Sequence, residues 1–444
     1  MENEKNTMME KIISLCKRRG FVYPGSEIYG GLAGTYDYGP HGVTLKNNIK
    51  KMWWKRFVED RDDMYGIDAA ILMNQEVWKA SGHVGGFSDP LSECSKCKHR
   101  FRTDQLSDSS VCPDCGGVLA PSKQFNMMFQ TNVGAVQDET SVSYLRPETA
   151  GGMFVNFKNV LDTFSPKLPF GLAQIGKAFR NEIAPRDFIF RVREFEQMEI
   201  EYFVKPDDWE KSFEELRLEM HAFMSDIGID KNLVSELAVS EEDRAFYSKK
   251  TTDFEFEYPF GKKELYGLAY RTDYDLNAHQ VGSKKDLTYF DEETRERFLP
   301  HVVEPSFGID RTILAVLCSA YKEEKISEDD TRVYLDLPFA VAPYKVCVSP
   351  LLKNKEELQT KAREVYAILK KEFGFVIYDD GGNIGKRYRK QDEIGTPYCV
   401  VIDFDTIGAG DSINPDFKDM VTVRDRNTGE QERVSIGDLV SKIK

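Results

Sequence analysis

Hydrophobic residues recur at helical spacing early in the chain. The positions concerned are Leu45, Ile49, Met52, Trp53 and Phe57. Intervals of three and four residues place them on one face of a helix that begins near Val43. The first 20 residues also mix apolar and charged positions, which predicts an amphipathic helix that ends near Gly20.

The middle of the chain changes to the alternation that is typical of β-strands. In MEIEYFV, residues 198–204, the apolar residues alternate with Glu199 and Glu201. One face of this strand is therefore apolar and the other acidic, and an acidic face either contacts solvent or lines a site. A charged stretch of about residues 205–250 follows and is predicted to be a helical insertion. The strand-like segments FEFEYPF and ELYGLAYRTDYDL come next.

A change of pattern divides the chain into two predicted domains, residues 1–337 and 338–444. Two prolines in LDLPFAVAPYKV interrupt the pattern at this boundary. Beyond it, the strand-like YKVCVSPL, FVIYDD and YCVVIDF alternate with helical segments, which predicts a compact α/β domain of about 100 residues.

Composition and charge narrow the class of protein. The chain has 444 residues, 41% of them hydrophobic and 30% charged, which is typical of a globular protein with more than one domain. No apolar run approaches the roughly 20 residues that cross a membrane, and signal-peptide features are lacking, so we expect a cytoplasmic protein that binds no membrane. The net charge of −14 falls on residues 1–337, so a polyanion would meet less repulsion at the second domain.

Four cysteines have the spacing of a metal site. They are Cys94, Cys97, Cys112 and Cys115, in a polar insertion of about residues 80–130. Two Cys-x-x-Cys pairs are typical of a tetrahedral Zn²⁺ site that stabilises a small ribbon. Disulfides or two unrelated pairs are the alternatives, and a reducing cytosol disfavours disulfides.

The common phosphate-binding loops are absent from the sequence, since it contains neither a P-loop nor a Gly-x-Gly-x-x-Gly motif after a strand. If the protein binds a nucleotide, free arginines must contact its phosphates. A guanidinium group matches phosphate oxygens in pairs and stays charged at any working pH. The candidates are Arg180, Arg191, Arg193 and Arg311.

Several segments resemble the motifs of class II aminoacyl-tRNA synthetases. AFRNE followed by FRVREFEQME resembles motif 2, EPSFGIDR resembles motif 3, and YDYGPHGVTLKNNI resembles the motif 1 region of the dimer contact. With YLRPETA and YRTDYDL, the chain is most similar to the dimeric glycyl-tRNA synthetases of the bacterial type. Residues 338–444, with GKRYRKQDEIGTPY, resemble the anticodon-binding domain shared with the histidyl, prolyl and threonyl enzymes.

This resemblance implies an α+β fold with an antiparallel sheet that is flanked by helices. A zinc-ribbon-like insertion and a C-terminal α/β anticodon-binding domain would be attached to it. It also implies ATP-dependent ligation of glycine to tRNA(Gly) through a glycyl-adenylate, with Mg²⁺ accompanying ATP, in a homodimer that does not bind DNA. The alternative is a synthetase-like RNA-binding protein that has lost catalysis; such a protein should lack the motif 2 and motif 3 arginines.

The resemblance also implies roles for individual residues. Arg180 would contact the α-phosphate and the substrate carboxylate, Glu182 would contact the adenine, and Phe195 would stack on it. Arg311 would cover the other adenine face and reach the γ-phosphate, while Glu264 and neighbouring carboxylates would bind Mg²⁺; Arg180, Glu182 and Arg311 are the implied catalytic residues. The further implied ATP contacts are Asn181, Phe190, Arg191, Val192, Arg193, Glu194, Leu265, Gly308, Ile309 and Asp310.

For the amino acid, the resemblance places Glu148, Glu199 and Glu304 around the ammonium group, with Ser306 beside it. A closed pocket can exclude every side chain by steric clash, so glycine needs no editing domain. The other implied glycine contacts are Arg102, Phe195, Glu196, Gln197, Met198, Pro305, Phe307 and Gly308. One position departs from the family, because RPETAGG has Gly151 where RPETAQG is usual, which removes a possible hydrogen bond near the site.

Overall fold

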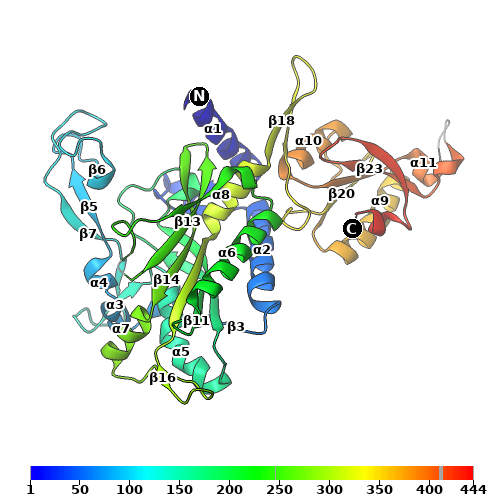
Figure 1. Ribbon diagram of the computed structural model, residues 1–444. Helices are drawn as coiled ribbons and strands as arrows, with labels where there is room; N and C mark the ends of the chain where they lie inside the picture. Colours follow the sequence, from blue (N-terminus) through cyan, green and yellow to red (C-terminus); the bar gives the residue numbers. More distant parts are fainter. Residues whose placement is uncertain (1, 246, 410–413, 444) are drawn as a thin grey trace.

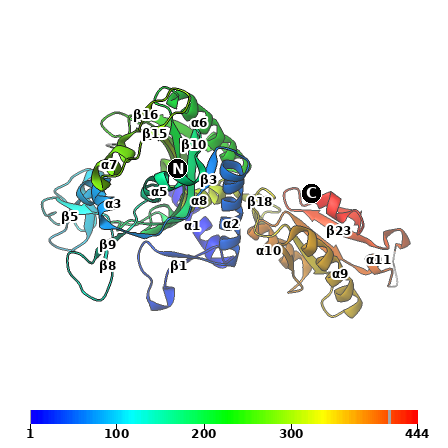
Figure 2. The same cartoon turned by 90° about the horizontal axis from the view of Figure 1, so that it is seen from below.

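The computed structural model describes residues 2–245, 247–409 and 414–443. Within these ranges, two large hydrophobic cores account for most of the buried side chains. The first core extends from Ile12 to Ala342 and the second from Val346 to Ile443. Figure 1 shows the two corresponding parts side by side, and Figure 2 shows the separation between them from below.

A seven-stranded sheet forms the centre of the first part. Its strands are β3 (Met64–Gly66), β10 (Phe170–Phe179), β11 (Glu194–Val204), β12 (Val234–Ala238), β13 (Lys250–Tyr258), β14 (Gly261–Thr272) and β17 (His301–Gly308). The order is β12-β13-β14-β17-β11-β10-β3, and every pair is antiparallel except β10 with β3. The α+β architecture expected from the sequence is therefore confirmed.

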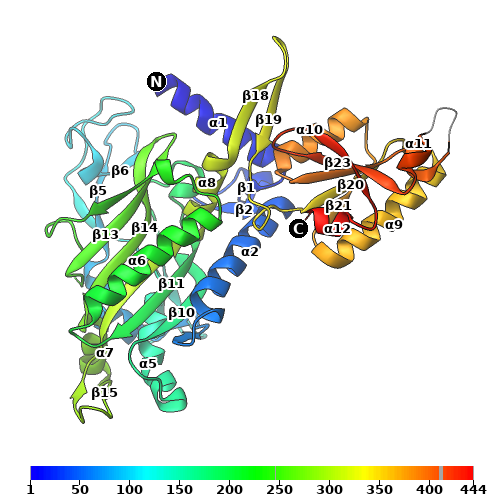
Figure 3. The ribbon, with the colours of Figure 1, turned by 45° about the vertical axis from the view of Figure 1, so that its right-hand side comes forward.

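Helices cover the two faces of the sheet unequally. They are α1 (Glu2–Arg18), α2 (Pro40–Trp54), α5 (Ala150–Phe164), α6 (Trp209–Asp226), α7 (Tyr274–Ser283) and α8 (Ile309–Ala320). Side chains of α1, α2, α6 and α8 pack with Met198, Ile200 and Phe307 in the main core, and Figure 3 shows α6 lying across this face. On the other face, α5 and α7 pack with Phe170 and Phe203. The rest of that second face is available for a site.

Two predicted helical regions differ in extent from the structure. The helix expected from Val43 begins at Pro40, where proline suits the first helical position because its missing N–H has no partner there anyway. Within the predicted helical insertion of residues 205–250, α6 is helical, but Val234–Ala238 form an edge strand of the main sheet. No helix among the described residues is both long and apolar enough to cross a membrane.

Smaller elements surround the sheet. The insertion comprises α3 (Gln75–Ala80), α4 (His83–Gly86), β5 (Ser88–Glu93), β6 (Arg100–Arg102) and β7 (Lys123–Asn126), with strand order β6-β5-β7. Short strands pair as β1 (Val22–Pro24) with β2 (Tyr36–Tyr38), β15 (Tyr289–Phe290) with β16 (Arg297–Phe298), and β18 (Tyr321–Lys325) with β19 (Thr331–Leu335). A further three-stranded sheet has the order β4 (Leu72–Met73), β9 (Val142–Leu145), β8 (Gln130–Asn132).

The second part is a mixed five-stranded sheet covered by helices. Its strands are β20 (Val346–Pro350), β21 (Val376–Tyr378), β22 (Tyr398–Ile402), β23 (Met420–Asp425) and β24 (Gln431–Ser435), in the order β21-β20-β22-β23-β24. Its helices are α9 (Glu356–Phe373), α10 (Ile384–Ile394), α11 (Phe404–Ile407) and α12 (Leu439–Ile443). The first three strands of the order are parallel, as the strand–helix alternation in the sequence predicts.

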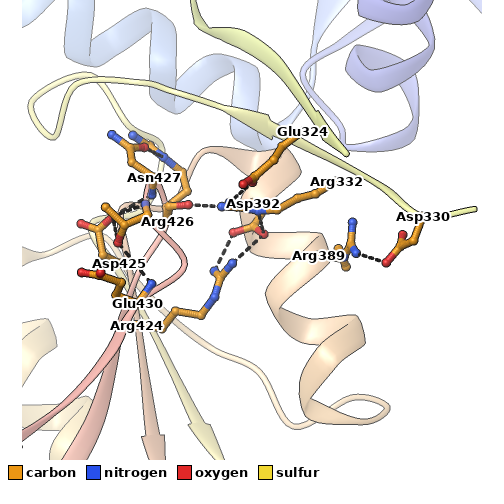
Figure 4. A network of polar contacts seen from close by, with 11 residues as sticks. Glu324, Asp330, Arg332, Arg389, Asp392, Arg424, Asp425, Arg426, Asn427 and Glu430 are labelled. Atoms are coloured by element: carbon orange, nitrogen blue, oxygen red, sulfur yellow. Dashed lines mark hydrogen bonds and ion pairs between the residues drawn. The ribbon is translucent and has the colours of Figure 1, made fainter. Parts of the chain in front are cut away.

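A polar network joins the two parts. Arg332 of β19 donates from Nε to Oδ2 of Asp392 in α10 at 2.8 Å, and Arg424 of β23 contacts the same carboxylate at 2.8 and 3.1 Å. Arg426 contacts Asp336 at 2.9 Å. Figure 4 shows Arg332, Asp392, Arg424 and Arg426 between the β18–β19 hairpin and the C-terminal sheet.

Candidate active site

The open face of the sheet carries the candidate site because of strand alternation. In β11, Glu199 lies opposite Gln174 of β10 and Ser306 of β17, and Ser306 lies opposite Gly267 of β14. Successive side chains of a strand point to opposite faces, so Phe195, Gln197 and Glu199 share the open face. The acidic face predicted from MEIEYFV therefore lines a site instead of contacting solvent.

A cavity opens beside the motif 2 loop. Predicted ATP contacts line it: Arg180, Glu182, Phe190, Arg191, Val192, Phe195, Glu264, Leu265, Gly308, Asp310 and Arg311. The guanidinium of Arg311 lies 4.5 Å from the centre of the Phe190 ring and 3.0 Å from Oε2 of Glu264. This guanidinium lowers the pKa of Glu264, so both groups are charged at neutral pH. The cavity combines aromatic surface with cationic groups, which suits a nucleotide.

Arg180 occupies the boundary between this cavity and a second one. Its Nε donates to the carbonyl oxygen of Pro147 at 3.0 Å, and its guanidinium lies between the rings of Phe87 and Phe195, 5.3 and 5.2 Å from their centres. Within the described residues Arg180 forms no ion pair, although it lines both cavities. Its charge is therefore available to an anionic ligand.

The second cavity is acidic. Glu148, Glu199, Glu304 and Ser306 line it, as the sequence predicts. Only 2% of the Glu199 surface is exposed, and its Oε1 accepts from Ser306 Oγ at 2.7 Å and Gln197 Nε2 at 2.6 Å. Burial, together with the charge of Glu148, raises the pKa of Glu199. A bound cation would stabilise the ionised form of these carboxylates.

An arginine that was not predicted as a site residue contacts this cluster of carboxylates. Arg271 is buried and forms ion pairs with Asp275 and Glu304, both at 2.7 Å. Burial still raises the pKa of Glu304 to about 8, and the charges of Glu199 and Glu148 act in the same direction. The carboxylates thus outnumber the positive charges around them. Arg271 and Asp275 belong to the segment YRTDYDL. The role of Arg271 could not be predicted from this segment, because it depends on the fold placing Glu304 beside the guanidinium.

Other lining residues were also missed. Residues between 239 and 247, including Asp243 and Arg244, border the acidic cavity although this stretch was expected to be helical. Asp253 of β13 lines it as well, and burial together with Glu264 and Glu255 raises the pKa of Asp253 to about 7. Glu201 is fully buried next to the cluster, and neither of its carboxylate oxygens has a hydrogen-bond partner among the described residues.

Several implied contacts do not line either cavity. They are Arg102, Asn181, Arg193, Glu194, Glu196, Met198, Pro305, Phe307 and Ile309. Glu196 points to the opposite face, where it pairs with Lys46 and Lys50 of α2, both at 2.6 Å. Met198, Phe307 and Ile309 belong to the main core.

The two arginines of this group have partners elsewhere. Arg193 donates to the carbonyl oxygens of Ala33 and Glu182 and so fixes the loop. Arg102 of β6 pairs with Asp89 and Asp104, both at 2.7 Å, in the insertion. These charges are already satisfied, so the structure does not bring them to the substrate side.

The cysteine cluster has the geometry of a metal site. The four sulfur atoms of Cys94, Cys97, Cys112 and Cys115 all lie within 4.8 Å of one another, and the cysteines are free. The backbone N–H of Cys97 donates to Sγ of Cys94 and lowers the pKa of this thiol to about 6. Four convergent thiols, one of them readily ionised, fit a tetrahedral Zn²⁺ ion. His99 instead contacts Asp114.

The structure explains why glycine occupies position 151. A Cβ atom at this position would lie 2.9 Å from the ring of Trp78, a buried residue of α3. The indole ring therefore takes space that a side chain at the start of α5 would need. The hydrogen bond that a glutamine could make is absent because this space is filled.

Comparisons with known proteins agree with this geometry. Residues 129–320 match the family model described as the tRNA synthetase class II core domain (G, H, P, S and T), and residues 345–444 match the anticodon binding domain. The structure is similar to Giardia lamblia prolyl-tRNA synthetase in complex with prolyl-adenylate. The TM-score is 0.71 over 98% of this chain and 75% of that one, at 16% identity. The fold and the site therefore define a class II aminoacyl-tRNA synthetase.

Curated relatives narrow the class. Proteins named glycine–tRNA ligase from Clostridium kluyveri and Lachnospira eligens are each 49% identical to this chain, over 98% of both chains for the former and 97% of both for the latter. The protein with that name from Clostridium tetani is also 49% identical, over 98% of this chain and 97% of that protein. The chain belongs to the glycine–tRNA ligase family, which confirms the resemblance in the sequence.

Proposed function

We propose that the protein ligates glycine to the 3′ end of tRNA(Gly), with ATP as the energy source and glycyl-adenylate as the intermediate. The observation that carries this proposal is the position of Arg180. Its guanidinium lies where the aromatic and cationic cavity meets the acidic one. A group there can contact the α-phosphate of ATP and the carboxylate of glycine together.

In the first step, the adenine ring binds between Phe195 and the guanidinium of Arg311, with Glu182 at its edge. Oε2 of Glu182 is buried without a hydrogen-bond partner in the described structure, so it can accept from the adenine amino group. Glycine binds with its ammonium group among Glu148, Glu199 and Glu304. Any larger amino acid would direct its side chain into the surrounding wall.

The glycine carboxylate then attacks the α-phosphorus, and pyrophosphate leaves. Arg180 neutralises charge on the attacking and phosphate oxygens, so positioning and electrostatics supply most of the catalysis. The carboxylates of Glu264 and Asp253 are the residues that would bind Mg²⁺, since hard oxygen donors suit this ion and their repulsion calls for a cation. When bound, Mg²⁺ neutralises charge on the phosphates. The ribose 3′-hydroxyl of tRNA finally attacks the adenylate carbonyl, and AMP leaves.

Residues 338–444 would bind the anticodon arm. A groove in this part combines the aromatic residues Tyr344, Tyr366 and Tyr378 with Arg363 and Lys370. Aromatic rings stack on unpaired bases, and cationic groups contact phosphates. This composition supports tRNA as the partner and gives no indication of DNA recognition.

A homodimer in the cytoplasm is the assembly that we propose. The segment before α2 exposes Ile28, Tyr29 and Leu32 to 89%, 87% and 60% of their surfaces. A second copy would cover this apolar group. Sedimentation of the purified protein tests the assembly, and a monomer at micromolar concentration would contradict it.

Exchange of labelled pyrophosphate into ATP tests the reaction. We expect exchange that depends on glycine and is unaffected by proline, threonine or histidine. Exchange stimulated by one of these amino acids instead would overturn the assignment of glycine. Complete absence of exchange would favour the alternative of a catalytically inactive RNA-binding protein, which the presence of both Arg180 and Arg311 in the cavities disfavours.

A further inference from the structure

A buried histidine lies at the base of the zinc-ribbon-like insertion, next to the acidic cavity. His83 begins α4 and exposes 4% of its surface. Its Nε2 lies 3.4 Å from Oε2 of Glu148, and its Nδ1 lies 2.8 Å from Oγ of Ser81. The rings of Trp78 and Phe87 pack against the imidazole, each with 5.5 Å between centroids. Two aromatic contacts and a polar partner at each nitrogen therefore hold the ring in place.

The hydrogen bonds around His83 leave Nε2 as the donor to Glu148. The Ser81 hydroxyl lies 2.8 Å from Nδ1 and 3.4 Å from the carbonyl oxygen of Trp78. The shorter contact suits donation of the single hydroxyl proton to Nδ1. Nε2 then carries the ring N–H and can donate to Glu148. Burial opposes ionisation of Glu148, but His83 lowers the pKa of this carboxylate to about 2, with smaller contributions from Arg271 and Arg180.

Each of the three cavity carboxylates has its own partner. Glu199 accepts from Ser306 and Gln197, and Glu304 pairs with Arg271. In the described part of the chain, the single ion pair of Glu148 is the one with His83. Without the imidazole, the orientation of Glu148 would be fixed less firmly, and its negative charge would be buried with weaker compensation.

We propose that His83 is a positioning residue of the substrate pocket, which donates from Nε2 to Glu148 and so orients this carboxylate toward the ammonium group of glycine. This inference rests on the proposed function, because it assumes glycine as the ligand. A carboxylate has two oxygen atoms, so Glu148 can accept from the imidazole and from the ammonium group at the same time.

The location of His83 also connects the insertion to the site. Asn126, the last residue of β7, donates from Nδ2 to the carbonyl oxygens of His83 and Val84 at 3.1 and 2.8 Å. Phe87, which follows α4, contacts both the imidazole and the guanidinium of Arg180. Both strands that lead into the insertion thus determine where the imidazole lies.

The charges that face the pair come from several elements. His279 of α7 faces His83, and Arg271 of β14 and Arg180, directly after β10, face Glu148. Glu199 of β11 and Glu304 of β17 are the neighbouring acidic groups. Substitution of His83 leaves all these groups in place, so a change in glycine affinity reports on the contact between His83 and Glu148.

The test is pyrophosphate exchange by His83→Leu and His83→Gln as a function of glycine concentration. For His83→Leu we expect a KM for glycine raised about tenfold or more, with a much smaller change in kcat and in the KM for ATP. The amide of His83→Gln can donate to Glu148 as Nε2 does, so this variant should recover part of the affinity.

His99→Gln is the matched control, because His99 belongs to the same insertion, is exposed, and contacts Asp114 instead of the cavity. An unchanged KM for glycine in folded His83→Leu, or equal losses for ATP and glycine, would overturn the proposal. If His83→Leu does not fold, a KM for ATP that rises as much as the KM for glycine in His83→Gln would overturn it equally. Exchange by the wild type that does not depend on glycine would instead refute the proposed function.

Discussion

Arg332 and Asp392 form an ion pair between the two parts of the chain, with 2.8 Å between Nε and Oδ2 and only 1% of the Asp392 side chain exposed. Arg424 contacts the same carboxylate from the second core. Removal of one member of a buried charge cluster leaves the others without compensation, which costs about 3–5 kcal/mol. We therefore expect Asp392→Ala to lower the stability of the junction and of the C-terminal part.

Thermal unfolding and limited proteolysis measure this effect. Asp330→Ala is the control, because Asp330 forms an exposed pair with Arg389 that should contribute no more than about 1 kcal/mol. Equal unfolding temperatures for the Asp392 and Asp330 variants would show that the junction does not depend on the buried cluster.

Loss of the Arg180 guanidinium should affect adenylate formation. We expect Arg180→Ala to lower the rate of glycine-dependent pyrophosphate exchange by about 10²–10³, the usual cost of removing one preorganised charge donor. The fold should be unchanged, because Arg180 forms no ion pair within the described structure. Arg186→Ala is the control in the same loop, since Arg186 is exposed and lines neither cavity. Comparable losses in both variants would contradict the assigned role.

The cysteine cluster should bind one Zn²⁺ ion per chain. Metal analysis of the purified protein checks this stoichiometry, and Cys94→Ser should abolish it because a hydroxyl is a poor Zn²⁺ ligand. Cys318→Ala provides the control, since Cys318 lies outside the cluster and is partly buried. Zinc-free protein with four titratable thiols in the cluster would refute the site.

The stability of the ligand-free protein should fall as the pH rises from about 5 to about 8. Burial raises the pKa of Glu304 to about 8 from an ordinary value of 4.5, so in this range the folded state keeps a proton that the unfolded chain releases. The unfolded state then binds fewer protons, and the free energy of unfolding falls by up to about 1.4 kcal/mol per pH unit for each such group. Urea unfolding at several pH values measures this slope.

Glu304→Gln should flatten the slope, because the amide has no proton to lose. Glycine binding should release protons below about pH 8, since its ammonium favours the ionised carboxylates. Calorimetry in buffers of different ionisation enthalpy detects this release. A slope that is the same in wild type and Glu304→Gln would assign the effect to other groups.

The sequence predicted the elements of the site better than the orientation of its residues. Alternation identified the acidic face of β11, and cysteine spacing identified the cluster of four thiols. Consecutive residues were nevertheless expected to contact substrate, whereas the pleat of the strand sends Glu196 and Met198 to the opposite face. That difference follows from the period of two and could have been foreseen.

Other features depend on contacts between distant segments. Arg193 was expected to bind phosphate, but its guanidinium contacts the carbonyl oxygen of Ala33, 160 residues away. Arg271 is next to Glu304 only because β14 pairs with β17. The loop at 239–247 looked helical in composition, yet it borders the acidic cavity because residues 234–238 extend the sheet. Local sequence patterns carry no information about such registers.

The contact between Gly151 and Trp78 constrains how this region can change. Restoring glutamine at position 151 would force a side chain against an immobile indole, whereas shrinking the indole alone would leave a void beside the helix. Each single replacement is therefore expected to destabilise the protein, whereas both replacements together should leave its stability unchanged. The two positions should vary as a pair among relatives, because a protein with only one of the changes would be less stable.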